Sequence, residues 1–153
     1  LSLGSVNVDR IMAVDEEVLA DIEAAHDWLP APGATRAVPE LPDAMVTATD
    51  ETVLGGKGAN QAVAAARAGA STSLLGAVGT DHVDLNILPS LRAAGVCVDD
   101  VAVRERSTGT ALIVVDPTAE NRIAILPGAN ATLTPSFVHD RRETLHEADV
   151  ILL

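Results

Sequence analysis

The chain has 153 residues, of which 48% are apolar, and its formal net charge at pH 7 is −12. This length suits one hydrophobic core and leaves little room for two independent domains. Lys57 is the only lysine, which argues against a nucleic-acid groove, since such grooves need clustered basic side chains. No apolar run reaches the roughly 18 residues of a membrane span, and the lone Cys97 offers no disulfide, so we expect a cytoplasmic protein without a membrane or nucleic-acid partner.

The first part of the chain predicts a strand, a helix and a turn. Residues 1–6 predict a short strand. Residues 15–29 carry apolar side chains at helical spacing behind three acidic residues that favour a helix start. Residues 29–38 contain two prolines and a glycine and predict a turn. Residues 44–54 mix β-branched and polar side chains in near alternation, which predicts one or two exposed strands.

The middle of the chain alternates helices and strands. Residues 59–68 are almost all good helix formers, and Gly69 stands where a helix often stops. Residues 71–79 then predict a buried strand, and residues 83–95 a helix that Pro89 shortens or kinks. A further strand is expected over 96–104.

The last part predicts a hairpin, a helix and a strand. Residues 109–116 and 121–128 flank the turn PTAE, which suits a hairpin, and Thr134 with Pro135 suits the N-cap and first position of a helix over 135–148. Residues 149–153 predict a final strand. Strands that alternate with helices indicate an α/β fold with a largely parallel sheet, and the hairpin and polar strands indicate a small accessory sheet.

Both ends of the chain lie in apolar segments. Leu1 begins inside a predicted strand, and the sequence stops at ADVILL. Natural termini are usually polar and exposed, so we expect the amino-terminal piece of a longer protein. The acidity indicates either adaptation to high salt or a bias toward Arg and Ala.

The loop LGGKGANQ, residues 54–61, joins glycines to a lysine, as phosphate-binding loops do. A P-loop would need a glycine where Glu51 stands and a Ser or Thr where Gly58 stands, and a dinucleotide-binding loop would need a glycine where Gln61 stands. A helix entrance with open backbone N–H groups remains, from which Lys57 and Asn60 would reach a neutral, hydroxyl-rich ligand. The alternative is a flexible turn capped by Asn60.

A second polar segment, GSVNVD at residues 4–9, follows the first strand. Asn7 and Asp9 occupy alternate positions, so both side chains would project from one side of an extended segment, beyond the carboxyl end of a strand where α/β proteins bind ligands. An ionised Asp9 could accept two hydroxyl protons, and Asn7 could donate to and accept from a third hydroxyl. The alternative is an ordinary Asx turn.

Six segments together resemble the amino-terminal half of the PfkB family of carbohydrate kinases, and its ribokinase-like members most. They are, in order, GSVNVD, PAPG, GGKGANQAVAAARAGA, GAVGTD, STGTALIVVD and ENRIAILPGAN, and they extend over nearly the whole chain. The resemblance implies a doubly wound, largely parallel α/β fold, of which residues 1–153 are the amino-terminal part. It also implies a small β-sheet lid, with strands within 34–55 and 101–128, that closes over the sugar and forms a homodimer interface.

The resemblance further implies a site for the sugar. Its polar residues would be Asn7, Asp9, Gly56, Lys57, Gly58 and Asn60, and its apolar wall would be Ala111, Ile113 and Ile125. The implied reaction transfers the γ-phosphoryl group of ATP to the primary hydroxyl of a furanose, most directly ribose, with Mg²⁺ and a monovalent cation as cofactors. The Gly-Ala-Gly-Asp motif that carries the catalytic aspartate is absent here, so we expect no catalytic residue, metal site or ATP pocket in this chain, and no activity from it alone.

Other functions stay open at this point. Kinases of the same family that act on nucleosides, fructose or ketodeoxygluconate are alternatives, and so is a non-catalytic module for sugar binding or dimerisation. The acidic segment 15–31 looks like an added helix before the lid, and this addition leaves the identity of the sugar open.

Overall fold

The computed structural model describes residues 1–153 and divides into two compact units. Unit 1 contains residues 1–7, 54–109 and 128–153, and unit 2 contains residues 8–53 and 110–127. Each unit is therefore assembled from segments that are far apart in the sequence.

Unit 1 is built on a parallel sheet with a long central strand. Strand β5 pairs in parallel with each of the other three strands of the sheet. Their bounds are β1 (Ser2–Leu3), β5 (Thr72–Gly79), β6 (Val96–Cys97) and β7 (Val101–Arg104). Leu74, Leu75, Ala77 and Val78 of β5 are fully buried, as expected for a strand covered on both faces.

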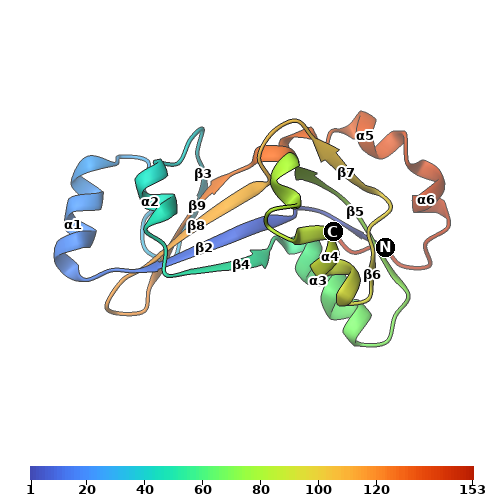
Figure 1. Ribbon diagram of the computed structural model, residues 1–153, viewed down its shortest axis with the longest axis horizontal. Helices are drawn as coiled ribbons and strands as arrows, with labels where there is room; N and C mark the ends of the chain where they lie inside the picture. The colour runs from blue at the N-terminus through green and yellow to red at the C-terminus, as the bar shows by residue number, and fades with distance from the viewer. The chain divides into compact units, whose positions relative to one another are not determined.

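Helices cover both faces of this parallel sheet. They are α3 (Lys57–Arg67), α4 (Ile87–Ala93), α5 (Pro135–His139) and α6 (Arg142–His146), with short 3₁₀ turns at Thr80–His82 and Gly128–Thr132. Figure 1 shows α3 and α4 on one side of the sheet and α5 and α6 on the other. This arrangement is the doubly wound one that right-handed crossovers produce, and it confirms the predicted fold class.

Unit 2 contains most of a five-stranded mixed sheet in the order β3-β9-β8-β2-β4. The strands are β2 (Asn7–Ala13), β3 (Thr35–Ala37), β4 (Glu51–Gly55), β8 (Gly109–Val115) and β9 (Asn121–Leu126). The expected hairpin is confirmed, since β8 and β9 pair antiparallel with Val115 opposite Asn121. Helices α1 (Glu16–Ala25) and α2 (Asp43–Thr47) complete the unit.

One face of the unit 2 sheet packs against these helices. Met12, Leu112 and Val114 from the strands form a buried cluster with Ile22 of α1 and Met45 of α2. Because side chains alternate along a strand, the even-numbered residues of β2 and β8 face the helices. The odd-numbered residues of these two strands face the other side of the sheet.

Two predicted helix end signals, the end of α3 and the start of α5, are confirmed. Helix α3 is followed by Gly69, whose φ of +94° is the left-handed conformation that closes a helix. Thr134 caps α5, because its side chain accepts a hydrogen bond from the Phe137 N–H, and Pro135 is the first helical residue.

The predicted strand over 44–54 is wrong in its first part. Asp43–Thr47 is helix α2, and only Glu51–Gly55 is a strand. The extended backbone of Pro42 starts the helix, the Thr47 hydroxyl donates to the Asp43 carbonyl at 2.9 Å, and Met45 enters the core. Burial of Met45 in the core cluster favours this helix, although the β-branched composition of the segment favours a strand.

Four other boundaries differ from the predictions. The strand expected over 96–104 is two strands, with a turn closed by the Val101 N–H on the Val98 carbonyl. The helix expected over 135–148 is two short helices, because the backbone leaves helical geometry at Arg141, which has φ −114° and ψ 23°. Helix α1 ends at Ala25 rather than residue 29, and the last strand is reduced to a single bridge between Leu152 and Ser2. Strand β7, expected among the accessory strands, pairs with β5 in the parallel sheet.

Candidate functional site

The glycine-rich loop packs tightly against the segment after β1. Gly56 has a φ of +93°, and a Cβ atom on it would lie 2.5 Å from the Ser5 carbonyl oxygen and 2.7 Å from the Asn7 nitrogen. A Cβ on Gly58 would lie 2.5 Å from the carbonyl carbon of Gly4. Only glycine allows this approach, so the two glycines bring the start of α3 next to the start of β2.

The backbone N–H groups at the start of α3 are mostly occupied. Lys57 donates its N–H to the Ser5 hydroxyl at 3.1 Å, and Ala59 donates to the Ser5 carbonyl at 3.1 Å. The Asn60 N–H donates to the Gly56 carbonyl at 2.9 Å. The expectation of open N–H groups was therefore wrong for three of the first four helical residues, because Ser5, which sequence reasoning missed, takes up two of them.

The side chains of Lys57 and Asn60 remain available. Both residues are exposed, Asn60 lies within the first turn of α3, and its side chain caps no helix. The alternative of a turn capped by Asn60 is thus wrong. Asn60 also lines a groove of about 410 Å³ with Arg67 and Ser90.

Asn7 is buried and held by a residue that sequence reasoning did not assign to the site. Its side chain is 7% exposed, and its Oδ1 accepts a hydrogen bond from Nδ2 of Asn130 at 2.8 Å. The Nδ2 group of Asn7 has no hydrogen-bond partner in the chain and can donate to a ligand. Asn130 lies in the quoted segment ENRIAILPGAN, but 123 residues separate it from Asn7, so no local signal links the two.

Asp9 follows Asn7 on strand β2, two residues along, so the two side chains leave the strand on the same side, as predicted. Asp9 is half-buried, and this desolvation raises the pKa of its carboxyl group above the ordinary value of 3.8. Its odd number places it on the sheet face opposite Met12 and the core cluster.

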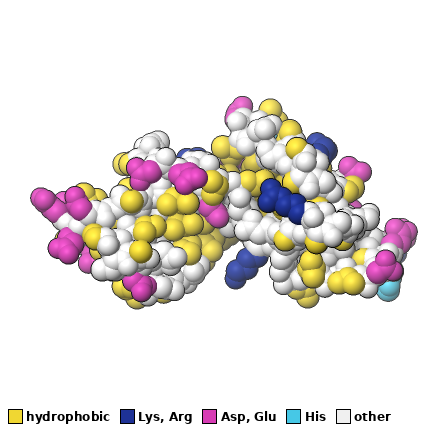
Figure 2. Space-filling view, turned by 90° about the horizontal axis from the view of Figure 1, so that it is seen from below, with side chains coloured by type: hydrophobic (Ala, Val, Ile, Leu, Met, Phe, Trp, Pro, Cys, Tyr) yellow, Lys and Arg dark blue, Asp and Glu magenta, His cyan; other side chains and the backbone are white.

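The three apolar candidates gather on that same face of the unit 2 sheet. Ala111 pairs directly with Ile125 across β8 and β9, and Ile113 lies two residues farther along β8. Ala111 is buried, and the two isoleucines are half-buried. Figure 2 shows unit 2, at the left, with a broad area of hydrophobic side chains bordered by acidic ones.

Metal-binding clusters and membrane helices were both sought in the structure. No three or more His, Cys, Asp or Glu side chains lie close enough together to hold a metal ion. None of the helices is both long and apolar enough to cross a bilayer.

Comparisons with known proteins agree on one family. The model of the pfkB family of carbohydrate kinases matches residues 2–153. Ribokinase of Bacillus subtilis is 40% identical over 116 residues, which are 75% of this chain and 39% of that enzyme. Deoxyribokinase of Salmonella typhi is 38% identical over 100 residues, or 65% of this chain and 33% of that protein.

A solved structure matches over nearly the full chain. The crystal structure of ribokinase from Thermotoga maritima superposes with a TM-score of 0.66 at 29% identity. The match covers 98% of this chain and 42% of that structure. This chain therefore spans less than half the length of the relatives it matches.

Proposed function

Because the chain belongs to the pfkB family of carbohydrate kinases, we propose that the protein containing it is an ATP-dependent sugar kinase that phosphorylates the primary hydroxyl of ribose. Within that protein, residues 1–153 supply the part of the site that binds the acceptor sugar. The similarity to ribokinases supports ribose as the first candidate.

The observation that carries this proposal is the pair of polar groups on one side of β2. Asn7 offers an unpartnered N–H donor, and Asp9 offers a carboxylate acceptor. A hydroxyl group both donates and accepts, so a polyol satisfies this pair better than a phosphate, which only accepts at neutral pH. Lys57 and Asn60 add further donors at the neighbouring start of α3.

These residues would act by binding and orienting the sugar. Fixing the ring hydroxyls holds the primary hydroxyl in one position for in-line attack, and positioning of this kind is a large part of phosphoryl-transfer catalysis. The apolar face formed by Ala111, Ile113 and Ile125 suits the carbon-bound hydrogens of a sugar ring and would exclude water. In this proposal ATP supplies the phosphoryl group, and the residues named here act on the acceptor sugar.

The same proposal assigns a function to the five-stranded mixed sheet. It would serve as a lid over the sugar and as the contact between two copies in a homodimer of the full-length protein. Sedimentation velocity of that protein tests the dimer, and a monomer at all concentrations would contradict it.

A sugar panel tests the activity of the full-length protein. Coupled ADP release is measured with ATP, Mg²⁺ and D-ribose, 2-deoxy-D-ribose, D-fructose, ketodeoxygluconate or adenosine. We expect the highest kcat/KM with ribose, and a strong loss in Asp9→Asn. A ribose rate far below the others would overturn the substrate assignment, and sugar binding without any turnover would support a non-catalytic module.

Deoxyribose is the second candidate, and one observation favours it. The identity to a deoxyribokinase, 38%, is close to the 40% identity to a ribokinase. The panel separates the two, because a site that binds the 2-hydroxyl by hydrogen bonds loses them with 2-deoxyribose and is left with unpaired polar groups.

A further inference from the structure

The side-chain amide of Asn130 has a fixed orientation. Its Oδ1 accepts the Val6 N–H at 3.0 Å, and its Nδ2 donates to the Val6 carbonyl at 3.0 Å. The backbone N–H can only donate and the carbonyl can only accept, so a flipped amide would face donor with donor and acceptor with acceptor. The position of each Asn130 atom is thus set by the main chain.

The backbone that carries Asn130 is also held in place. The preceding Ala129 is fully buried and donates its N–H to the Ser107 carbonyl at 2.9 Å. The Thr132 hydroxyl donates to the Ala129 carbonyl at 2.8 Å. Gly128 approaches Ser107 so closely that a Cβ on it would lie 2.6 Å from the Ser107 carbonyl oxygen. This 3₁₀ turn is therefore a rigid support for the Asn130 side chain.

The second N–H of Asn130 Nδ2 points at Asn7. It donates to Oδ1 of Asn7 at 2.8 Å, which turns Nδ2 of Asn7 away from Asn130. The orientation of one amide thus determines the orientation of the other. Asn7 could otherwise present either its oxygen or its nitrogen to a ligand, because the two ends of an amide have almost the same shape.

We infer that Asn130 is a positioning residue, which holds Asn7 so that an N–H donor and not a carbonyl acceptor meets the substrate. This inference rests on the proposed function, in which Asn7 contacts the sugar. The substrate group at this place must then offer a lone pair. A hydroxyl that accepts from Asn7 and donates to Asp9 satisfies both side chains, and a sugar that lacks this hydroxyl leaves both unsatisfied.

A double-mutant cycle on the full-length protein tests the inference. The dissociation constant of D-ribose is measured by titration calorimetry for wild type, Asn130→Ala, Asn7→Ala and the double variant. We expect Asn130→Ala to weaken binding about 3- to 10-fold, as for one lost hydrogen bond, and to have no further effect in the Asn7→Ala background. Asn121→Ala is the matched control, since it removes the same kind of side chain from an exposed position on β9 that does not touch Asn7 or Asn130, and it should leave affinity unchanged.

Two results would overturn the inference. One is an unchanged ribose affinity in Asn130→Ala, and the other is a loss that adds fully to that of Asn7→Ala. If Asn130→Ala does not fold, Asn130→Asp decides by the same criteria, because it keeps an acceptor for the Val6 N–H but cannot donate to Asn7. Calorimetry needs no turnover, so ribose binding without ADP release would contradict the proposed kinase function alone and leave the Asn130 test intact.

Discussion

Gly58 lies against Gly4 at backbone contact distance, and a Cβ on Gly58 would lie 2.5 Å from the carbonyl carbon of Gly4 and 2.7 Å from its Cα. Two segments that are more than fifty residues apart thus meet without any side chain between them. This contact sets the position of Lys57 and Asn60 beside the start of β2. The glycines of the loop therefore serve close packing rather than an open anion cradle.

Gly58→Ala should destabilise the protein. Helix propensity alone predicts a gain of up to about 1 kcal/mol, but overpacking against backbone costs about 1–3 kcal/mol, so we expect a net loss in urea unfolding and weaker ribose binding as α3 shifts. Gly69→Ala is the control, because it meets no atom within 4 Å and is strained only by its φ of +94°. It should lower stability without changing ribose affinity, and a stabilised Gly58→Ala would show the contact to be unimportant.

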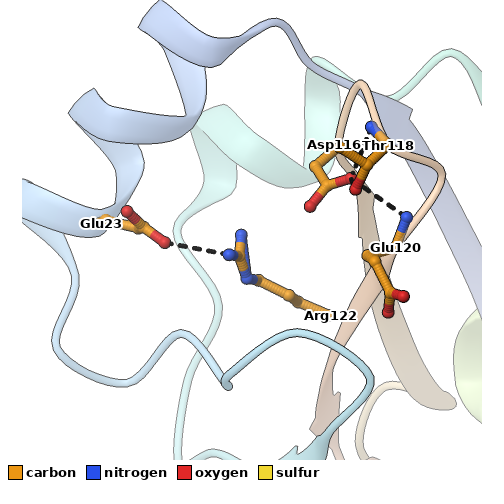
Figure 3. A network of polar contacts seen from close by, with 5 residues as sticks. All are labelled: Glu23, Asp116, Thr118, Glu120 and Arg122. Carbon is orange, nitrogen blue, oxygen red and sulfur yellow. Dashed lines mark hydrogen bonds and ion pairs between the residues drawn. The ribbon is translucent and has the colours of Figure 1, made fainter.

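Arg122 and Glu23 form an ion pair of unequal burial beneath α1. The Arg122 Nη2 lies 3.1 Å from the Glu23 Oε1, and the two side chains are 8% and 52% exposed (Figure 3). Nε and Nη1 of Arg122 are buried without a partner. The carboxylate is therefore the main compensation for a buried charge.

Removal of Glu23 and removal of Arg122 should affect the free energy of unfolding differently. Glu23→Ala should lower the free energy of unfolding by about 1–3 kcal/mol, below the 3–5 kcal/mol of a fully buried pair because Glu23 reaches solvent. Arg122→Met should leave stability unchanged or raise it, since it removes the two unpaired donors. Urea unfolding measures both, and a large loss in Arg122→Met would mean that the ion pair is net stabilising.

The turn between β8 and β9 contains a strained alanine. Asp116 Oδ1 accepts hydrogen bonds from the Thr118 N–H, the Thr118 hydroxyl and the Glu120 N–H, and this network leaves Ala119 with a φ of 65° (Figure 3). We expect Ala119→Gly to raise the free energy of unfolding by about 0.5–1 kcal/mol, because relief of the left-handed strain exceeds the added entropy of the unfolded chain. Ala66→Gly inside α3 is the control and should cost about 1 kcal/mol. Equal losses in both variants would contradict the strain.

Sugar affinity should depend on pH through Asp9. Burial raises the pKa of Asp9 in the folded protein above 3.8, and only the ionised carboxylate accepts two hydroxyl protons. As the pH is lowered, ribose affinity should therefore begin to fall at a higher pH than it would with an exposed aspartate. The free energy of unfolding should change in the opposite direction, because protonation of Asp9 removes the cost of burying its charge. Titrations between about pH 7 and pH 4 on wild type and Asp9→Asn check this. The variant should bind weakly at all pH values, and a pH profile identical to wild type would exclude Asp9.

Local sequence signals correctly predicted the elements that depend on helix propensity, capping and turn residues. The alanine-rich α3, the cap at Thr134 and the hairpin around Asp116 all follow from propensity, capping and turn chemistry. The sequence-based predictions of element type and boundary were wrong where local patterns do not determine the structure. Met45 of α2 enters the core cluster in a segment predicted as a strand, and a backbone break at Arg141 divides the helix predicted over 135–148.

The candidate site shows the same division. The placement of Asn7 and Asp9 on one side of the strand was expected from strand periodicity, whereas Ala111, Ile113 and Ile125 were expected only from the family resemblance. The roles of Ser5 and Asn130 could not be predicted. Ser5 contacts Lys57 and Asn130 contacts Asn7, and both pairs are too far apart in sequence for a local pattern to reveal them. Supporting residues of this kind emerge only from the packed structure.

The structure of the full-length protein with D-ribose bound tests the central claim most directly. The account predicts a sugar hydroxyl within about 3.2 Å of Nδ2 of Asn7 and of the Asp9 carboxylate, with Lys57 or Asn60 on a neighbouring oxygen. Ribose bound elsewhere, for example in the groove lined by Asn60, Arg67 and Ser90 with no contact to Asn7 or Asp9, would contradict it.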